Sequence, residues 1–286
     1  MSGAQFSMSG EEYLARHHVI TYLEDAVSQL LEHREENSRV NPAKFLSDYF
    51  TSVHRGNHTL FREYEYIKAT PHNRTAFIRI FWKCFRQVGK SGDLLNAKEY
   101  QSLLCLLCPD FPLEVVQKTA RIVLMDDAMD CLMSFTDFLF AFQLQFYYDE
   151  FLYTSSEIYT NIMSATRGSR DTVVVPTVSR AKGKTPQLSD GPDSVESAQF
   201  FEAVKMLCET FQFSHPPVDI LRGILMSAPR VSFYGFLMAL AKHEGINSAV
   251  GILPPKGQIL DDTDPDIQIS SARTPRPVSA VPKPAS

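Results

Sequence analysis

Residues 133–151 read MSFTDFLFAFQLQFYYDEF, and this stretch decides the fold class. Ser134 and Asp137 have the spacing of a helix N-cap and its capping partner, so a helix is expected to begin here. From Phe138 onward, aromatic side chains fall on nearly every face of that helix. A helix that is apolar all round is buried, because no face of it suits water. The stretch therefore predicts an all-α domain, with this helix either in the domain core or under a partner.

A short pattern around Ser134 occurs three times in the chain. It consists of an apolar residue, a small polar N-cap, three further residues and an aromatic residue that begins an apolar helix. The copies are LNAKEY at 95–100, MSFTDF at 133–138 and VSFYGF at 231–236. This unit resembles the end of an EF-hand loop that runs into its exiting helix. The resemblance implies an EF-hand-like helical domain made of residues 60–163 and 199–250.

The three loops are poor in calcium ligands. An EF-hand binds calcium through oxygens at loop positions 1, 3, 5, 9 and 12, with glycine at position 6. In that register the first loop begins at Val88 and the third has Gly235 at position 12, so neither has enough ligands. The second loop begins at Asp126 and offers three more oxygen ligands: Asp130, Ser134 and Asp137. We expect structural turns, and we leave open weak calcium binding by the Asp126 loop.

The N-terminal region predicts a pair of amphipathic helices over residues 10–55. Apolar residues recur at three- and four-residue spacing between Leu14 and Leu31, which is typical of one helix face. Asn41 and Pro42 suit the N-cap and the first residue of a second helix. Two helices of this size cannot form a self-sufficient core. Their apolar faces must therefore meet either the rest of this chain or another copy of it.

Residues 13–50, YLARHHVITYLEDAVSQLLEHREENSRVNPAKFLSDYF, resemble the dimerisation-docking module of the type II regulatory subunit of cyclic-AMP-dependent protein kinase. The resemblance rests on a leucine-rich first helix, a polar turn and an N-P-x-x-F-L-x-x-Y-F second helix. In that family two hairpins form a four-helix dimer whose groove accepts an amphipathic helix. The resemblance implies a partner-binding face and a homodimer as one assembly. The residues assigned to this face are Leu23, Val27, Leu30, Leu31, Phe45, Leu46, Tyr49 and Phe50.

The aromatic residues are unevenly distributed along the chain. None of the 20 Phe, 11 Tyr and 1 Trp lies in residues 164–198 or 251–286, and these two segments hold many of the prolines. Segments of this composition cannot bury enough apolar surface to offset their lost conformational entropy. We expect a disordered insert at 164–198 and a disordered tail at 251–286. Thr185 and Thr274, each followed by proline, are candidate phosphorylation sites there.

Composition and motifs argue against several functional classes. The net charge of −5 gives no overall basic footprint for nucleic acid, and no apolar run approaches the ~18 residues of a membrane span. No phosphate-binding glycine motif, nucleophile elbow or kinase motif set occurs. Cys105 and Cys108 have no second ligand pair for zinc, and they lie late in an apolar helix rather than at a redox site. We expect no catalysis, no cofactor, no metal, and no nucleic-acid or membrane partner.

Several longer segments resemble the family of centriolar satellite-associated tubulin polyglutamylase complex regulators. They are DAVSQLLEHRE, ATPHNR, LLCPDFPLE, ARIVLMDDAMDCLMSFTDFLFAFQLQFYYDEFL and VSFYGFLMALAKHEGIN. The resemblance implies a non-catalytic regulator or scaffold that assembles or localises the polyglutamylase complex. The chemistry would belong to a tubulin-tyrosine-ligase-like catalytic subunit. The implied partners are the subunits of that complex, a scaffold protein of centriolar satellites, and microtubules reached indirectly.

The same resemblance implies a location in the cytoplasm and cytoskeleton, at the microtubule organising centre, the centrosome and its centriolar satellites. It also implies an influence on microtubule polyglutamylation, cytoskeletal organisation and cilia. A second interpretation rests on the N-terminal helices alone. In that interpretation the protein is a ciliary or cytoskeletal docking adaptor that binds amphipathic anchoring helices. The sequence does not decide which subunit contacts which face, or whether the helices meet a second copy or a different protein.

Overall fold

The computed structural model describes residues 9–124, 130–168 and 194–261. These residues are predominantly helical, with four two-residue strands, so the predicted all-α class is confirmed. Within the described part of the chain, no helix has the length and apolar character needed to cross a membrane. Asp126, Thr185 and Thr274, three residues singled out by the sequence, lie outside the described residues.

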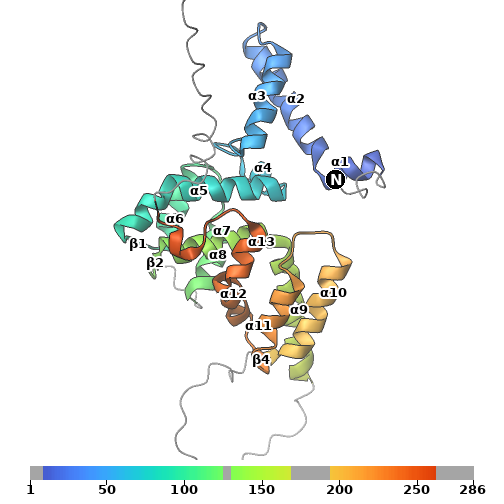
Figure 1. Cartoon of the computed structure of the whole chain (residues 1–286), viewed down its shortest axis with the longest axis vertical. Coiled ribbons are helices and arrows are strands. Elements are labelled where there is room, and N and C mark those ends of the chain that lie inside the picture. Colours follow the sequence, from blue (N-terminus) through green and yellow to red (C-terminus); the bar gives the residue numbers. More distant parts are fainter. Residues whose placement is uncertain (1–8, 125–129, 169–193, 262–286) are drawn as a thin grey trace, which may run out of the picture.

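The N-terminal region is a hairpin of two long helices preceded by a short one. Helix α1 covers Gly10–Arg16, α2 covers Val19–Glu36 and α3 covers Pro42–Arg55. Figure 1 shows α2 and α3 side by side, projecting from the end of the molecule at which α4 (Tyr64–Lys68) and α5 (Pro71–Ser91) lie. The predicted pair of helices over residues 10–55 is therefore present, with an additional break between α1 and α2.

The first half of the body repeats a helix–strand–helix order. It contains α5, β1 (Leu94–Leu95) and α6 (Ala97–Cys105), followed by α7 (Leu113–Leu124), β2 (Met133–Ser134) and α8 (Phe135–Tyr147). The two strands pair in antiparallel fashion, with Leu94 opposite Ser134 and Leu95 opposite Met133. Each strand leads directly into a capped helix, so this one short ladder fixes the starts of α6 and α8 relative to each other.

The second half of the body has the same order. It contains α9 (Asp149–Gly168), β3 (Val195–Glu196) and α10 (Ser197–Thr210), followed by α11 (Val218–Leu225), β4 (Arg230–Val231) and α12 (Phe233–Lys242). Strands β3 and β4 pair in antiparallel fashion, with Val195 opposite Val231 and Glu196 opposite Arg230. Helix α13 (Glu244–Val250) and a 3₁₀ turn at Lys256–Gln258 complete the described chain.

The pattern found three times in the sequence is confirmed and has a fourth copy. The side chains of Asn96, Ser134 and Ser232 each accept a hydrogen bond from the backbone N–H three residues later, as predicted N-caps do. The fourth helix start is at Glu196, at the beginning of α10. In all four copies the aromatic residue four positions after the cap is fully buried: Tyr100, Phe138, Phe200 and Phe236. The sequence analysis assigned this fourth copy to the insert, because Glu196 is not a usual N-cap residue.

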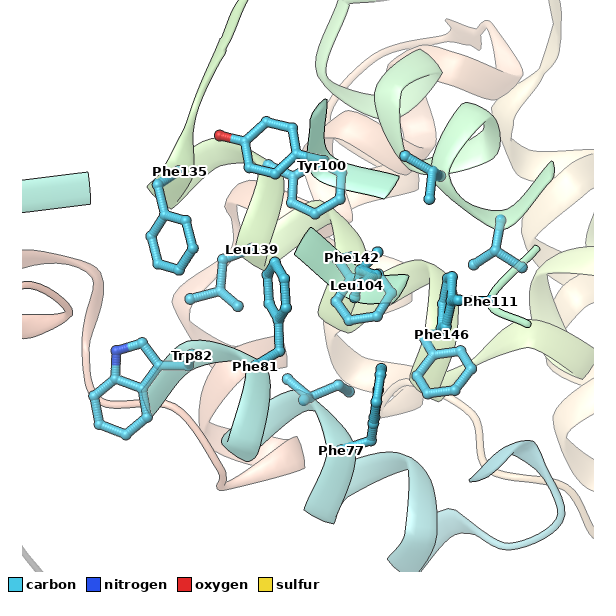
Figure 2. Packing of buried hydrophobic residues seen from close by; sticks show 14 of the residues in the cluster. Phe77, Phe81, Trp82, Tyr100, Leu104, Phe111, Phe135, Leu139, Phe142 and Phe146 are labelled. Carbon is cyan, nitrogen blue, oxygen red and sulfur yellow. The ribbon is translucent and has the colours of Figure 1, made fainter. Parts of the chain in front are cut away.

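Helix α8 lies at the centre of the body. A row of its phenylalanines, Phe138, Phe142 and Phe146, stacks along one side with ring centroids 5.8 and 5.4 Å apart. Tyr100 of α6 stacks on Phe138 at 3.8 Å. Figure 2 shows the rings of α5, α6 and α8 gathered in this first core. Other faces of α8 contribute Ala141 and Leu144 to a second core, shared with α9, α10, α11 and α12. The sequence left open whether this helix is covered by a partner, and the structure places it in the core.

An ion pair between a buried arginine and a half-exposed glutamate joins the two halves of the body at α5 and α9. Arg74 is 5% exposed, and its two terminal nitrogens donate to the two carboxylate oxygens of Glu150 at 2.7 and 2.8 Å. The same guanidinium donates to the carbonyl of Tyr147 at 3.1 Å. A bidentate arginine–carboxylate pair fixes direction as well as distance, so α5 is held against the junction between α8 and α9.

The predicted insert and tail are both too long. Helix α9 continues to Gly168 and strand β3 begins at Val195, so 164–168 and 194–198 belong to the folded body rather than to the insert 164–198. Residues 251–261, expected in the disordered tail 251–286, contribute Leu253 and Ile259 to the first core. The indole N–H of Trp82 donates to the carbonyl of Ile259 at 2.9 Å. The absence of aromatic residues misled the prediction, because short aliphatic residues fill gaps between rings supplied by other helices.

The packing of the C-terminal segment makes a first prediction. We expect Ile259→Ala to lower the free energy of unfolding by ~2–4 kcal/mol, because it removes a buried side chain from the first core. The neighbouring exposed substitution Gln258→Ala should change it by less than ~0.5 kcal/mol. Urea denaturation of the full chain measures both values. Equal stability of the two variants would show that residues 251–261 do not belong to the folded body.

Candidate docking surface of the N-terminal hairpin

Local sequence signals set the limits of the hairpin helices. Helix α3 begins where Asn41 caps the N–H of Lys44 at 3.1 Å, with Pro42 at the first helical position. It ends at Gly56, whose φ of +71° is the left-handed conformation that glycine adopts most readily. Helix α2 begins after His18, which has a φ of +51°. These start and stop signals leave residues 37–41 as the turn that folds α3 back along α2.

The hairpin has a small interior of its own. Tyr22 and Ala26 of α2 meet Tyr49 of α3 there, and the partly buried side chains packed around them are Phe45, Leu46 and Val53. Such a cluster is much smaller than either core of the body. The apolar side chains inside the hairpin therefore hold its two helices together, and they leave the outer face of α2 uncovered.

A continuous apolar surface follows that outer face. Its members, here called the α2 stripe, are Ile20, Leu23, Val27 and Leu31, which are 49%, 45%, 48% and 57% exposed. Leu30 flanks the stripe and is partly exposed. At ~100° per residue the four positions fall within a sector of about 80°, and the buried Tyr22 lies on the far side of the helix from most of them. On α3, Phe50 is 38% exposed.

The structure places the predicted docking residues in two groups. The outer group comprises Leu23, Val27, Leu30, Leu31 and Phe50. The inner group, Phe45, Leu46 and Tyr49, packs between the two helices. Tyr49 is only 8% exposed, so its assignment to a partner-binding face is corrected: its hydroxyl is occupied inside the hairpin. Ile20 was missed by the sequence analysis, although its three-residue spacing to Leu23 was a signal for it.

A carboxylate at the base of the hairpin fixes it to the body. Arg62 donates to the two oxygens of Asp25 at 2.6 and 3.0 Å, and the Tyr49 hydroxyl donates to the same carboxylate at 2.6 Å. The guanidinium of Arg62 also lies 3.8 Å from the ring centre of Tyr66. Burial alone raises the pKa of Asp25, but the hydrogen bonds from Arg62 and Tyr49 outweigh burial and hold the pKa below its ordinary value. Asp25 is therefore a charged anchor.

A second, buried network lies beside this anchor. The Tyr22 hydroxyl donates to the Asn73 side-chain oxygen at 2.7 Å and lies 2.8 Å from the Thr70 hydroxyl. The same Asn73 oxygen lies 2.8 Å from Nε2 of His58, while the Asn73 amide nitrogen donates to the carbonyl of Tyr66. Because an amide oxygen only accepts, His58 must carry its proton on Nε2. Its other nitrogen, Nδ1, is then a buried acceptor without a hydrogen-bond donor among the described residues.

Together these contacts hold the hairpin rigidly against α4 and α5. The side-chain hydrogen bonds that cross between hairpin and body include Arg62 to Asp25 and Tyr22 to Asn73, residues 37 and 51 positions apart. The His58 ring also stacks on His72 with centroids 5.3 Å apart. Such a junction orients α2 so that its stripe faces away from the body rather than packing on it. The alternative that the apolar faces of the hairpin pack against the rest of this chain therefore does not hold for the α2 stripe.

Comparison with known proteins identifies the family. A family model described as the CSTPP1 N-terminal domain matches residues 7–56, the hairpin described above. A protein from Mus musculus is 53% identical over 272 residues, covering 94% of this chain and 82% of the relative. A protein from Homo sapiens is 50% identical over 286 residues, covering 98% of this chain and 86% of the relative. Both are named Centriolar satellite-associated tubulin polyglutamylase complex regulator 1.

This chain belongs to that family. A further relative, from Danio rerio, carries the same name and is 52% identical over 94% of this chain. The shared name places these relatives at centriolar satellites, which belong to the centrosome and the cytoskeleton of the cytoplasm. No solved structure matches the chain. The family recognised from the sequence segments is thus confirmed, and the separately matched domain coincides with the part of the chain that carries the α2 stripe.

The buried histidine makes a prediction about pH. Burial is the main reason that the pKa of His58 lies below its ordinary value of 6.5, and His72 and Arg62 add to the effect. The unfolded chain therefore takes up a proton at higher pH than the folded chain does. Stability should fall as the pH drops below 6.5, by at most ~1.4 kcal/mol per pH unit from this group.

Urea denaturation between pH 7 and 5.5 tests this, with His58→Gln as the comparison because glutamine does not titrate and keeps an amide N–H donor. We expect a smaller loss of stability on acidification in His58→Gln than in the natural chain. The lowered pKa of Asp25 matters only at more acidic pH, since its ordinary value is 3.8. An identical pH dependence in the two proteins would contradict the assignment of a neutral, buried His58.

Proposed function

We propose that this protein is a non-catalytic regulator of the tubulin polyglutamylase complex at centriolar satellites. The proposal takes its subject from the name of the relatives, with which the chain shares about half of its residues over most of its length. In this role it modulates microtubule polyglutamylation, and through it the cytoskeleton and cilia. It acts as a scaffold that assembles or localises the complex. Its partners are the complex subunits, including the tubulin-tyrosine-ligase-like catalytic subunit, and a satellite scaffold protein, with microtubules reached indirectly.

The observation that carries the mechanism is the α2 stripe. Four large aliphatic side chains on one face of α2 are each about half exposed, whereas the opposite face of the same helix is buried. Apolar side chains gathered in this way mark an association surface, because burying them on a partner removes them from water. The hairpin's attachment through Asp25 and Asn73 keeps the stripe directed outward. A fixed, outward apolar face suits a protein whose function is to hold others together.

We infer that a second copy of the chain covers this stripe. The hairpin has the helix–turn–helix order of the dimerisation-docking module that the sequence resembles, and two helices of that size need a further partner to complete a core. A two-fold axis would place the α2 stripe of one copy against that of the other, which satisfies both copies with one kind of contact. The dimer then offers two equivalent sets of surfaces for complex subunits, and loss of the dimer should weaken every such contact.

The body supports the proposal as a rigid carrier. We infer that its four helix–strand–helix units form two EF-hand-like pairs, because each pair is closed by a short antiparallel ladder between its loops. A calcium role is not part of the proposal. The carboxylate of Asp137, at the expected twelfth loop position, accepts from the Ser134 hydroxyl and pairs with Lys256 at 2.9 Å. This carboxylate therefore already has a cationic partner in the folded chain.

The experiment is co-precipitation of the polyglutamylase subunits with the full chain. We expect Leu23→Glu to reduce their recovery at least ~5-fold, because a charge in the stripe cannot be buried without a partner charge. Ser28→Glu adds the same charge on an exposed, polar part of α2 and should leave recovery unchanged. Circular dichroism checks that both variants stay helical. Unchanged recovery with Leu23→Glu would contradict the proposed role of the stripe.

The alternative function, a docking adaptor for amphipathic anchoring helices, is separated by one further measurement. A generic amphipathic anchoring peptide, labelled with a fluorophore, is titrated with the full chain. Under our proposal the complex subunits are recovered and this generic peptide binds only weakly. Tight binding of the peptide that is lost in Leu23→Glu, together with no recovery of complex subunits, would favour the adaptor instead.

A further inference from the structure

A cavity of about 150 Å³ lies where the two halves of the body meet, and no residue of the hairpin lines it. Helix α12 of the second half packs there on α7 and α8 of the first half. Two alanines, Ala141 on α8 and Ala241 on α12, line the cavity. Their side chains are too short to fill the space between the helices. Further apolar walls are formed by Ile122, Phe140 and Met238.

Three charged side chains also line the cavity: Asp137, Lys242 and Lys256. Oδ1 of Asp137 lies 2.9 Å from Nζ of Lys256, and its Oδ2 accepts a hydrogen bond from the Ser134 hydroxyl at 2.8 Å. Burial alone raises the pKa of Asp137, but the hydrogen bonds from Lys256 and Ser134 outweigh burial and hold the pKa below its ordinary value. Asp137 is therefore ionised at neutral pH, and both of its oxygens already have a donor.

Lys242 is the charged group of this lining that the fold leaves without a direct partner. It is exposed, and its ammonium group forms no ion pair or hydrogen bond within residues 9–124, 130–168 and 194–261. Lys256, by contrast, is held by Asp137 and lies 6.0 Å from the centre of the Phe140 ring. Two lysines and one aspartate give the lining a net charge of +1. The cavity therefore combines an apolar interior with one ammonium group that is available to an anion.

The volume of the cavity fits one side chain rather than a cofactor. Sites for cofactors and drug-sized ligands usually have volumes of ~300–1,000 Å³. An apolar cavity of ~150 Å³ accepts a benzene molecule, which has the size of a phenylalanine ring. Because the cavity is partly open to solvent, the backbone that carries such a ring can stay outside it. Single apolar side chains that fill a pocket in this way are typical anchors of protein–protein contacts.

We propose that this cavity binds a peptide segment of a partner protein in which a phenylalanine is flanked by glutamate or aspartate. The ring fills the space beside Ala141 and Ala241, and a neighbouring carboxylate binds the ammonium group of Lys242. Charge complementarity selects the acidic flank, since the lining is cationic and its one carboxylate is already paired. The inference does not rest on the proposed function, and the site is separate from the α2 stripe.

The test is a titration of the full chain with the peptide acetyl-Glu-Phe-Glu-amide, followed by nuclear magnetic resonance of isotope-labelled isoleucine and methionine methyl groups. We expect saturable shifts at Ile122 and Met238, which line the cavity. Acetyl-Glu-Ala-Glu-amide should bind at least ~10-fold more weakly, because it lacks the ring that is buried. Acetyl-Lys-Phe-Lys-amide should also bind at least ~10-fold more weakly, because it brings like charges to Lys242.

Two variants of the chain change the cavity independently. Ala241→Leu fills it without changing charge and should weaken binding of the Glu-Phe-Glu peptide at least ~10-fold; Ala198→Leu makes the same change at an exposed position of α10 and should have no effect. Lys242→Glu reverses the available charge and should weaken binding at least ~5-fold. Lys98→Glu, on an exposed position of α6, should stay within ~2-fold. Circular dichroism checks that all four variants are folded.

Several outcomes would overturn the inference. They are the absence of shifts at Ile122 and Met238 with millimolar Glu-Phe-Glu peptide, equal affinity for the alanine or lysine peptide, and unchanged affinity in Ala241→Leu. An equal loss in Lys98→Glu and Lys242→Glu would overturn it too, because net charge alone would then be recognised. Shifts at Ile122 on removal of residues 262–286, with none on addition of peptide, would assign the cavity to the chain's own tail instead of a partner.

Discussion

The bond between Arg62 and Asp25 is the interaction on which the functional account depends. The hairpin has only a small interior, so apolar packing alone would let it take many orientations on the body. A bidentate ion pair, with the Tyr49 hydroxyl on the same carboxylate, admits one orientation. That orientation turns the buried side of α2 toward the junction and the α2 stripe outward. The outward stripe thus follows from a polar contact at its base.

The body depends on a different constraint, which is the placement of α8 between two cores. Its phenylalanines stack within the first core, while Ala141 and Leu144 belong to the second. Because both halves share one helix, and Arg74 ties α5 to α9 through Glu150, the body behaves as one support. A rigid body is needed for the hairpin at its end to keep one orientation.

Much of this fold could be predicted, because its signals are local. Three helices begin with a cap, at Asn96, Ser134 and Ser232. Each cap and the aromatic residue four positions later lie within one six-residue stretch of the sequence. The fourth copy was missed because Glu196 caps no backbone N–H with its side chain, so only Phe200 marked it. The extent of the tail was also missed, since Ile259 is buried by Trp82 and its neighbours from a helix almost 180 positions earlier in the chain. No composition rule detects a contact of that kind.

The residues of the candidate site also divide into those that local sequence spacing predicts and those that only long-range contacts decide. The apolar spacing of α2 predicted Leu23, Val27 and Leu31, and the structure leaves them exposed. Tyr49 matched the same motif but turns inward, because its hydroxyl finds Asp25 on the neighbouring helix and its ring fills the hairpin interior. The motif identifies which residues are apolar, whereas long-range partners decide which of them face out. The partners Arg62, Thr70 and Asn73 have no motif of their own and could not be found from the sequence.

The most direct measurement of the central claim is the solution mass of the full chain, by sedimentation equilibrium over a concentration series. The account predicts twice the mass of one chain for the natural protein and for Ser28→Glu, and the mass of one chain for Leu23→Glu. A single-chain mass for the natural protein at every concentration would contradict the claim that a second copy covers the α2 stripe. A double mass that persists in Leu23→Glu would contradict it equally, because the dimer would then form elsewhere.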